Sequence, residues 1–146
     1  MIDKTFIDSN VLVYGHDVDA GEKREIAKNV LRDLWADRTG VLSAQVLQEF
    51  YVDVTCKIRT PLPKAEARKV VETYGVWCLE ATAVEDILTA SKTEEEANIS
   101  FWDALIITMA AKTGATRLLS EDLNPEQLIA GVTVVNPFAG AHRESR

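Results

Sequence analysis

The sequence has few of the side chains that bind soft metals or form disulfide bonds. Its 146 residues include two cysteines and two histidines. Cys56 and Cys78 lack the spacing of a metal site, so we expect reduced thiols in the core of a cytoplasmic protein. His16 and His142 stand alone in the chain, which argues against a zinc site built on histidine. Disulfide scaffolds and histidine-based zinc sites are therefore not expected.

The chain also lacks long apolar runs. No run approaches the ~20 residues that a membrane span requires, so we expect no membrane association. The N-terminal residues "MIDKTFID" contain no basic segment followed by an apolar stretch, which argues against a signal peptide. Hydrophobic residues make up 47% and charged residues 27% of the chain, a balance typical of globular proteins. We predict a single domain over residues 1–138, followed by a disordered tail over residues 139–146.

Positive charge is scarce. The chain has 16 Lys and Arg residues against 23 Asp and Glu, which gives a formal net charge of −7 and a pI of about 4.8. A protein that coats DNA without sequence preference needs a basic surface, so this balance argues against that function. An enzyme that acts on nucleic acid remains compatible with it, because carboxylates grouped around a metal ion raise the negative count while they create a cation site.

Strand and helix patterns alternate regularly along the chain. Short apolar runs bounded by turn residues predict strands, and apolar residues at helical spacing predict helices. The predicted strands cover residues 4–8, 40–43, 76–81, 116–120 and 132–136, and the predicted helices cover residues 22–38, 44–58, 64–73, 83–97, 100–115 and 124–131. This alternation predicts an α/β fold with a mostly parallel sheet.

Acidic residues stand at the positions where such a fold binds ligands. In α/β sheets, ligands bind beyond the carboxyl ends of the strands. Asp8 ends the first predicted strand, and Asp122 follows the fourth. Glu49 lies on the helix after the second strand, and Asp103 lies in the first turn of the helix over 100–115. If the first and fourth strands are neighbours, these carboxylates face one crevice.

Each carboxylate has a simpler interpretation when it is taken alone. Asp103 fits a capping box with Ser100 at the start of its helix. Glu49 fits a solvated helix surface, and Asp122 fits a helix cap. Asp8 is the hardest to explain in this way, although it could accept backbone N–H bonds. It stands among apolar residues, and burying an ionised carboxylate costs on the order of several kcal/mol unless the charge is paired.

Taken together, the four acidic residues fit a divalent-metal site. Carboxylates that converge repel one another, and a bound cation relieves that repulsion. Mg²⁺ prefers oxygen ligands, and proteins hold it with a few carboxylates, water and substrate phosphate. Two such ions ~3.5–4 Å apart can activate water and stabilise the leaving oxygen of a phosphodiester. The set therefore fits metal-assisted hydrolysis, which does not require a Ser, Cys or His nucleophile.

Three segments of the chain resemble PIN-domain nucleases, and most closely the VapC-type ribonuclease toxins of type II toxin–antitoxin systems. They are "FIDSNVLVY", "SAQVLQEFY" and "SFWDALIITMAAKTGATRLLSED". The resemblance extends over nearly the whole chain, and the acidic motifs stand in the family's order. It implies a three-layer α/β/α sandwich around a central, mostly parallel sheet. It also implies an enzyme that uses Mg²⁺ or Mn²⁺ to hydrolyse RNA phosphodiester bonds.

The resemblance assigns roles to six residues and implies two protein partners. By motif, the catalytic metal ligands correspond to Asp8, Glu49, Asp103 and Asp122, and the groups that orient water or a carboxylate correspond to Asn10 and Ser120. VapC-type proteins typically form homodimers, and a cognate antitoxin that covers the acidic groove inhibits them. The resemblance therefore implies a homodimer and an antitoxin as well as an RNA substrate.

A basic segment is a candidate contact for RNA. The stretch "KIRTPLPKAEARKV" contains five cationic residues, Lys57, Arg59, Lys64, Arg68 and Lys69. Such a cluster predicts an edge that attracts the RNA backbone. A solvated helix surface without a ligand is the simpler alternative, and the sequence leaves both open.

Other functions compete with the toxin hypothesis. A housekeeping RNA-processing nuclease of the same family without an antitoxin remains open, as does a noncatalytic binding module that keeps the fold. An aspartyl phosphatase needs a second aspartate two residues after Asp8, where Asn10 stands instead. Asp17 and Asp19 suggest a calcium loop, but the glycine at position 21 is misplaced for an EF-hand, so a polar turn is the better interpretation.

Overall fold

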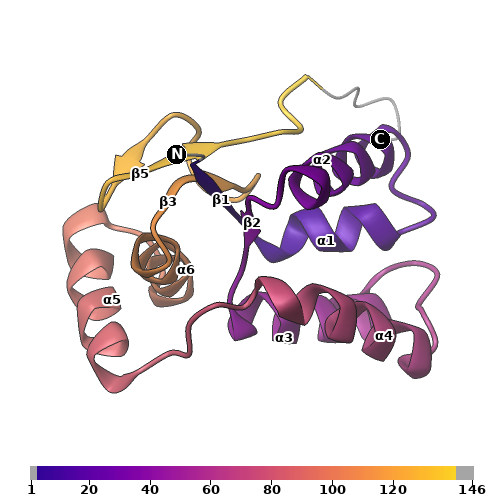
Figure 1. Ribbon diagram of the computed structural model, residues 1–146, viewed down its shortest axis with the longest axis horizontal. Coiled ribbons are helices and arrows are strands. Elements are labelled where there is room, and N and C mark those ends of the chain that lie inside the picture. The colour runs from indigo at the N-terminus through magenta and orange to yellow at the C-terminus, as the bar shows by residue number, and fades with distance from the viewer. Residues whose placement is uncertain (1–2, 141–146) are drawn as a thin grey trace.

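The computed structural model describes residues 3–140 of the chain (Figure 1). The strands are β1 Lys4–Ile7, β2 Gly40–Val41, β3 Ala115–Leu119, β4 Leu128–Ile129 and β5 Val132–Val135. The helices are α1 Ser9–His16, α2 Glu22–Asp37, α3 Ala44–Val52, α4 Lys64–Tyr74, α5 Val84–Ala97 and α6 Phe101–Lys112, with a π-helical turn at Asp53–Lys57 and a 3₁₀ turn at Gly75–Trp77. Most of the predicted tail over 139–146 lies outside the described residues, so its disorder stays a prediction.

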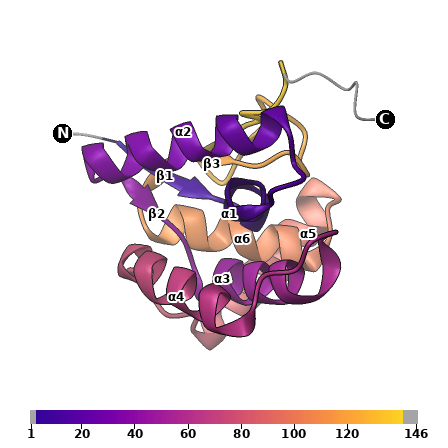
Figure 2. The same cartoon turned by 90° about the vertical axis from the view of Figure 1, so that its right-hand side faces the viewer.

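The five strands form one sheet in the order β2-β1-β3-β5-β4. The neighbours from β2 to β5 pair in parallel, and only β4 pairs antiparallel, with β5. Helix α2 lies on one face of this sheet and α6 on the opposite face (Figure 2). The predicted three-layer α/β/α architecture with a mostly parallel sheet is therefore confirmed.

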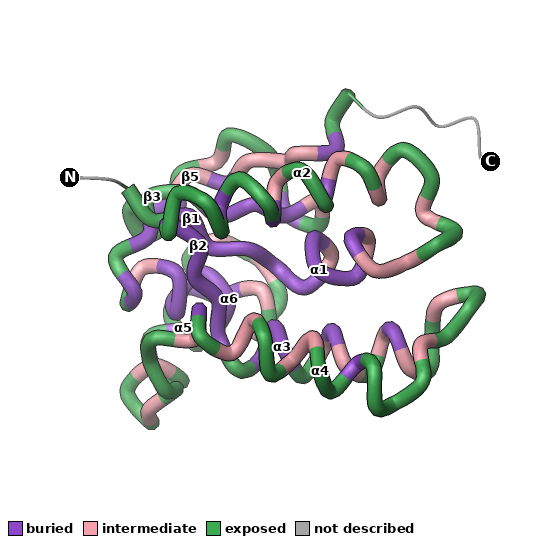
Figure 3. Tube along the Cα trace, turned by 45° about the vertical axis from the view of Figure 1, so that its right-hand side comes forward, coloured by how far each residue is buried: buried purple, intermediate pink, exposed green. Residues whose placement is uncertain are grey.

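The core runs through β1 and α6. Phe6 and Ile7 on β1 and Leu118 on β3 have no solvent-exposed surface. Helix α6 is buried at every position from 104 to 110, as expected for a helix that is apolar on all sides. Figure 3 shows the buried trace along β1, β2 and α6, with exposed residues on α2 and α4. These buried elements hold the ends of the strands in fixed positions.

The predicted strand over 76–81 is wrong. Residues Gly75–Trp77 form a 3₁₀ turn, and in the described part of the chain a single parallel bridge, between Leu42 and Cys78, links the segment to the sheet. Trp77 is the buried residue of this run and packs where a side chain at Gly40 would clash, whereas Val76 and Leu79 are more than half exposed. A central strand of a parallel sheet is buried on both faces. This segment buries one residue, so it does not form such a strand.

The predicted helix over 124–131 is also wrong. Glu126 and Ala130 have φ angles of +63° and +54°, which a right-handed helix cannot include. Leu128 and Ile129 instead form β4, and the N–H of Glu126 donates to the carbonyl of Val134 at 2.6 Å. The apolar pair that suggested a helical face completes the edge of the sheet.

Three smaller differences concern helices and cysteines. Helix α1 was not predicted, because its apolar residues read as a continuation of the first strand's run. The helix expected over 44–58 ends as an α-helix at Val52 and continues as the π-helical turn. Cys56 is exposed, so the expectation of a core thiol is wrong for that residue, while Cys78 is half-buried.

Within residues 3–140, no helix is long and apolar enough to cross a membrane.

Candidate active site

The site begins where β1 and β3 end side by side. Ile7 and Leu119 pair at the last position of the two parallel strands, so Asp8 and Ser120 follow at adjacent points. The N–H of Asp8 donates to the carbonyl of Leu119 at 3.0 Å. The sequence had predicted that an acidic crevice would form if these two strands were neighbours, and the structure meets that condition.

Asp8 is a buried carboxylate that no described Lys, Arg or His side chain pairs with. Its surface is 4% exposed, and it accepts hydrogen bonds from the Ser9 N–H and the Ser120 hydroxyl, each at 2.7 Å. Burial raises the pKa of Asp8 to about 6, the two hydrogen bonds oppose this rise, and the charges of Glu49 and Asp122 add to it. Among the described residues Asp8 forms no ion pair. The backbone bond is therefore present, but it leaves the charge uncompensated.

Glu49 on α3 is held between α1 and α6. Its two carboxylate oxygens accept hydrogen bonds from the Ser9 hydroxyl and the Gln45 side-chain amide, both at 3.0 Å. The same Gln45 nitrogen donates to the Trp102 carbonyl at 3.2 Å. Glu49 is half-buried rather than fully solvated. These bonds connect the first residue of α1 to the first turn of α6 through Glu49.

Asp103 combines both interpretations that its sequence allowed. Its N–H donates to the Ser100 hydroxyl at 3.1 Å, so Ser100 caps α6 as predicted. Its carboxyl also faces the acidic crevice. Burial raises the pKa of Asp103, the hydrogen bond with Ser100 lowers it, and the charge of Asp122 raises it further. Capping thus places a carboxylate at the helix N-terminus without removing it from the site.

Asn10 and Ser120 connect Asp8 to Asp122. The Asn10 side-chain amide donates to the Asp122 carboxylate at 3.2 Å and to the Ser120 hydroxyl at 3.4 Å. The Asp122 N–H donates to the Ser120 hydroxyl at 3.1 Å. The side-chain oxygen of Asn10, Oδ1, is buried and has no hydrogen-bond partner among the described residues, so it remains available as an acceptor. The two polar residues expected to orient the site lie between its carboxylates.

The four predicted carboxylates line one cavity of about 490 Å³. The lining residues are Asp8, Ser9, Gln48, Glu49, Val52, Asp53, Lys57, Asp103, Ile106 and Asp122. Five of them carry carboxylates and one, Lys57, carries an ammonium group. Lys57 lies 3.7 Å from Asp53. The cavity therefore holds a surplus of negative charge, and its lining within residues 3–140 contains no histidine or cysteine.

This donor set fits a hard divalent cation. Every charged donor is a carboxylate oxygen, the preference of Mg²⁺ and Mn²⁺ over soft metals. In the described part of the chain, no three carboxylate, imidazole or thiol groups converge closely enough to form a preformed metal cage. Mg²⁺ does not need such a cage, because it keeps several waters and binds one or two carboxylates directly. The raised pKa of Asp8 and the unpaired Asn10 side-chain oxygen fit a site whose charge and lone pairs a cation would satisfy.

The predicted basic cluster does not gather at the cavity. Lys57 lines the cavity, whereas Arg59 lies in the loop after it and the other three lie on α4. Arg68 lines a separate, largely apolar cleft beside Tyr51. All five cationic side chains are exposed, so their contact with RNA stays a prediction.

Sequence reasoning missed Ser9 and Gln45, which hold Glu49. Ser9 directly follows Asp8, and Gln45 stands four residues before Glu49, one turn away on the same face of α3. That spacing was a usable signal for Gln45. Ser9 had no signal, because the chain was not expected to turn into a helix at Asp8.

Comparisons with known proteins agree with this fold. A family model described as "PIN domain" matches residues 5–128. No curated protein matches the sequence.

Solved structures share the fold at low sequence identity. A toxin–antitoxin complex from Klebsiella pneumoniae aligns with a TM-score of 0.64 and 16% identity, over 92% of this chain and 98% of the other. VapBC2 from Rickettsia felis, bound to a DNA fragment of its promoter, aligns at 0.57 and 14%, over 89% and 96%. Mycobacterium tuberculosis VapC20, a Sarcin-Ricin loop cleaving toxin, aligns at 0.57 and 19%, over 79% and 87%. At these identities the likeness shows a shared fold.

Proposed function

Because the chain belongs to the PIN domain family, we propose that it is a divalent-metal-dependent endoribonuclease and the toxin of a type II toxin–antitoxin pair. One observation carries the proposal: carboxylates from α3, α6 and the ends of β1 and β3 line a single cavity around the buried, uncompensated Asp8. The cofactor we propose is Mg²⁺ or Mn²⁺.

The residues of the cavity take separate roles in this proposal. When bound, a divalent cation would act as a Lewis acid and would lower the pKa of a water molecule, so that a nucleophile is available at neutral pH. Asp8 and Asp103, which both line the cavity, are the ligands that we propose bind it directly. Glu49 and Asp122 bind it directly or through water. Asn10 and Ser120 hold the Asp8 and Asp122 side chains in fixed positions relative to each other through their hydrogen bonds.

RNA is the proposed substrate. A phosphodiester in an acidic cavity needs cations to offset its charge, and within the described residues the cavity wall supplies only Lys57. The bound metal and a positively charged edge are therefore required for substrate binding. The Mycobacterium tuberculosis structure with this fold is described as a toxin that cleaves the Sarcin-Ricin loop, which supports RNA over DNA as the first substrate to test. Because the proposed substrate is cellular RNA, the proposed location is the cytoplasm.

The proposed protein partners are an antitoxin and a second copy of the chain. The Klebsiella pneumoniae and Rickettsia felis structures are a toxin–antitoxin complex and a VapBC2 complex. In this protein Val76, Leu79 and Trp102 are more than half exposed, and such apolar surface is typical of protein interfaces. An antitoxin that places an Arg or Lys side chain in the cavity would compensate the charge of Asp8 and block the cation site.

The test is cleavage of RNA by the purified protein. We expect cleavage with Mg²⁺ or Mn²⁺ and none with EDTA, with mapped ends that recur at defined positions. Growth arrest on expression, reversed by a co-expressed neighbouring antitoxin, would separate a toxin from a housekeeping nuclease. Absence of cleavage with either metal, in protein that is folded, would favour a noncatalytic module.

A further inference from the structure

Glu121 is an acidic residue between two members of the site, yet it does not line the cavity. Ser120 and Asp122 flank it, and both belong to the hydrogen-bond chain that reaches Asp8. The Glu121 carboxylate instead accepts one hydrogen bond from the Tyr14 hydroxyl and one from the Lys23 ammonium group, the latter at 2.9 Å. It is therefore directed toward α1 and α2.

Tyr14, Lys23 and Glu121 form a compact group, which we name the Glu121 clamp. Lys23 lies 5.0 Å from the centre of the Tyr14 ring, and that ring packs edge-on against Phe138 at 5.0 Å. The Lys23 and Glu121 side chains are 29% and 21% exposed. Burial and the Glu121 charge raise the pKa of Tyr14, so its hydroxyl remains a donor. Partly buried, charge-assisted hydrogen bonds of this kind are stronger than exposed ones.

The segment that the clamp contacts is anchored at both of its ends. Ser120 is fully buried and its N–H donates to the Val135 carbonyl at 3.0 Å, and Leu123 is buried in the core. Between these ends, the Glu121 clamp and the Asn10 amide hold the chain. Residues 120–123 belong to no helix or strand. Within the segment, the Ser120 hydroxyl donates to Asp8 and accepts from the Asp122 N–H, so a shift of the chain at Glu121 would move both contacts. A displacement of about 1 Å in a catalytic group can lower turnover by about 100-fold.

We propose that Tyr14 and Lys23 are positioning residues that act through Glu121 to fix Ser120 and Asp122 at the metal cavity. The inference rests on the proposed nuclease function, since it concerns the geometry of that site. The clamp has a second effect: it keeps the Glu121 carboxylate, paired with Lys23, away from a cavity that already carries surplus negative charge.

The experiment compares variants of the clamp with a matched ion pair elsewhere. Lys23→Met removes the cation, Tyr14→Phe removes the hydroxyl, and Lys23→Arg keeps the charge. The control is Lys112→Met, because Lys112 and Asp86 form a pair of similar length (2.8 Å) and similar exposure (30% and 13%) at the far end of α6. The readouts are turnover at saturating Mg²⁺, Mg²⁺ binding by calorimetry, thermal midpoint, and amide exchange of residues 121–123 without metal.

We expect Lys23→Met and Tyr14→Phe to lower turnover at saturating Mg²⁺ by about tenfold and to speed amide exchange at 121–123. The double variant should lose less than the product of the single effects, because both residues act through Glu121. Lys23→Arg should restore most of the turnover. Lys112→Met should lower the thermal midpoint to a similar extent without changing turnover or exchange at 121–123.

Three results would overturn the inference. If Lys23→Met tightens Mg²⁺ binding and leaves saturated turnover unchanged, Lys23 acts only through charge. If Lys112→Met reproduces the loss of turnover and the faster exchange, the effect is one of general stability. Should the wild-type protein neither bind Mg²⁺ nor cleave RNA, the proposed function fails by itself. Amide exchange at residues 121–123 still tests whether the clamp holds this segment, because unchanged exchange in Lys23→Met and Tyr14→Phe contradicts the inference.

Discussion

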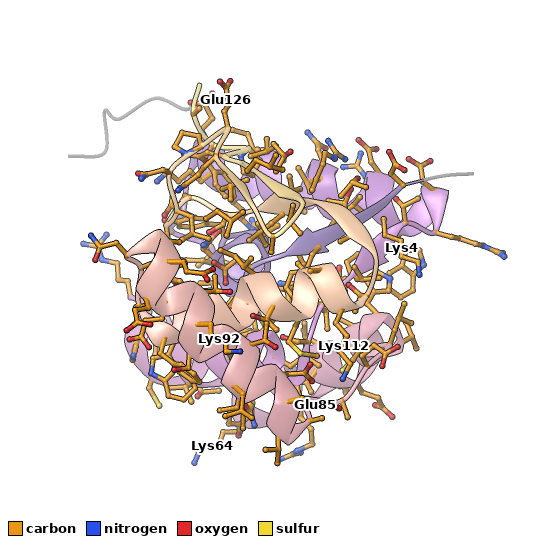
Figure 4. The ribbon with its side chains drawn as sticks, turned by 90° about the vertical axis from the view of Figure 1, so that its left-hand side faces the viewer. Lys4, Lys64, Glu85, Lys92, Lys112 and Glu126 are labelled. Carbon is orange, nitrogen blue, oxygen red and sulfur yellow. The ribbon has the colours of Figure 1, made fainter. Side chains whose placement is uncertain are left out.

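Asp8 and Asp86 each accept a hydrogen bond from a backbone N–H at the start of a helix, and both bonds are 2.7 Å long. Their surroundings are opposite. Asp86 lies 2.8 Å from the Lys112 ammonium group, and hydrogen bonds from Lys112 and the Ala83 N–H lower its pKa. Asp8 is buried beside Glu49 and Asp122, and its pKa is raised. Figure 4 shows Lys112 at the end of α6 with Glu85 of the neighbouring α5 close by.

The contrast separates a carboxylate that is paired within the structure from one that we propose to be functional. A helix N-terminus favours a negative charge in both places. At Asp86 the cation completes the interaction, and the result ties α5 to α6. At Asp8 no described residue supplies a cation, so the fold carries a charge that destabilises it. Perturbed carboxylates of the second kind cluster at functional sites, which is why Asp8 is the centre of the proposal.

The largest expected effect is on RNA cleavage. Asp8→Asn keeps the shape of the side chain and a good helix cap, but it removes the charge that binds the cation. We expect cleavage to fall by about 100-fold or more, since loss of a residue that only supports a metal ligand already costs about 10- to 100-fold. Asp86→Asn should cleave at the wild-type rate. Equal losses in the two variants would erase the distinction between the two carboxylates.

The next effect is on stability. Asp8→Asn, which should lower cleavage, should raise the free energy of unfolding at neutral pH. Asp8 has a pKa of about 6 in the folded protein against 3.8 as the ordinary value, so the folded state binds the proton more tightly. Without metal, the free energy of unfolding should therefore decline as pH rises from 3.8 through about 6, by on the order of 3 kcal/mol. Asp8→Asn should lack this decline and be more stable than the wild type at pH 7. Urea unfolding in EDTA at several pH values measures it, and parallel pH profiles would contradict the assignment.

A smaller loss of stability is expected at Asp86. Replacing it by Ala removes the bond to the Ala83 N–H, and loss of such a cap costs about 1 kcal/mol. Because the folded pKa of Asp86 is lowered, its contribution is present above its ordinary pKa and disappears as pH falls. Chemical denaturation of Asp86→Ala at pH 7 and at low pH tests both statements. RNA cleavage by the folded variant should be unchanged.

The smallest effect concerns charges outside the cavity. Replacing Lys64, Arg68 and Lys69 of α4 with Ala should weaken RNA binding modestly. It should also flatten the dependence of binding on salt, by about one in slope for each phosphate that the variant no longer neutralises. Fluorescence anisotropy with labelled RNA at several salt concentrations measures the slope. An unchanged slope would show that α4 is only a solvated surface.

The sequence was sufficient for most of the fold because the strands that matter are buried on both sides. Phe6 and Ile7 on β1, and Leu118 and Leu119 on β3, are buried apolar pairs between helices, which is the pattern of a parallel sheet covered on both faces. The two elements that were predicted wrongly lie at the edges of the sheet, whereas the unpredicted helix α1 lies in the core. At 76–81 and 124–131 the apolar residues are partly exposed, and local backbone angles, as at Glu126 and Ala130, decide the structure.

The acidic positions were predictable for the same reason, since they follow the ends of the strands. What the sequence could not provide was the set of contacts between them. The bonds from Ser9 to Glu49 and from Lys23 to Glu121 join residues whose relation depends on how α1, α3, α2 and the loop after β3 pack. The opposite behaviour of Asp8 and Asp86 was likewise invisible, because it depends on Lys112 lying at one site and no described cation at the other.

Calorimetric titration with Mg²⁺ tests the central claim most directly, because it asks whether the cavity around Asp8 binds a divalent cation. The wild-type protein and the Asp86→Asn variant should bind Mg²⁺ with the same affinity, and Asp8→Asn should bind it at least about tenfold more weakly. Equal binding by Asp8→Asn and the wild type, or no binding by the folded wild-type protein, would contradict the account.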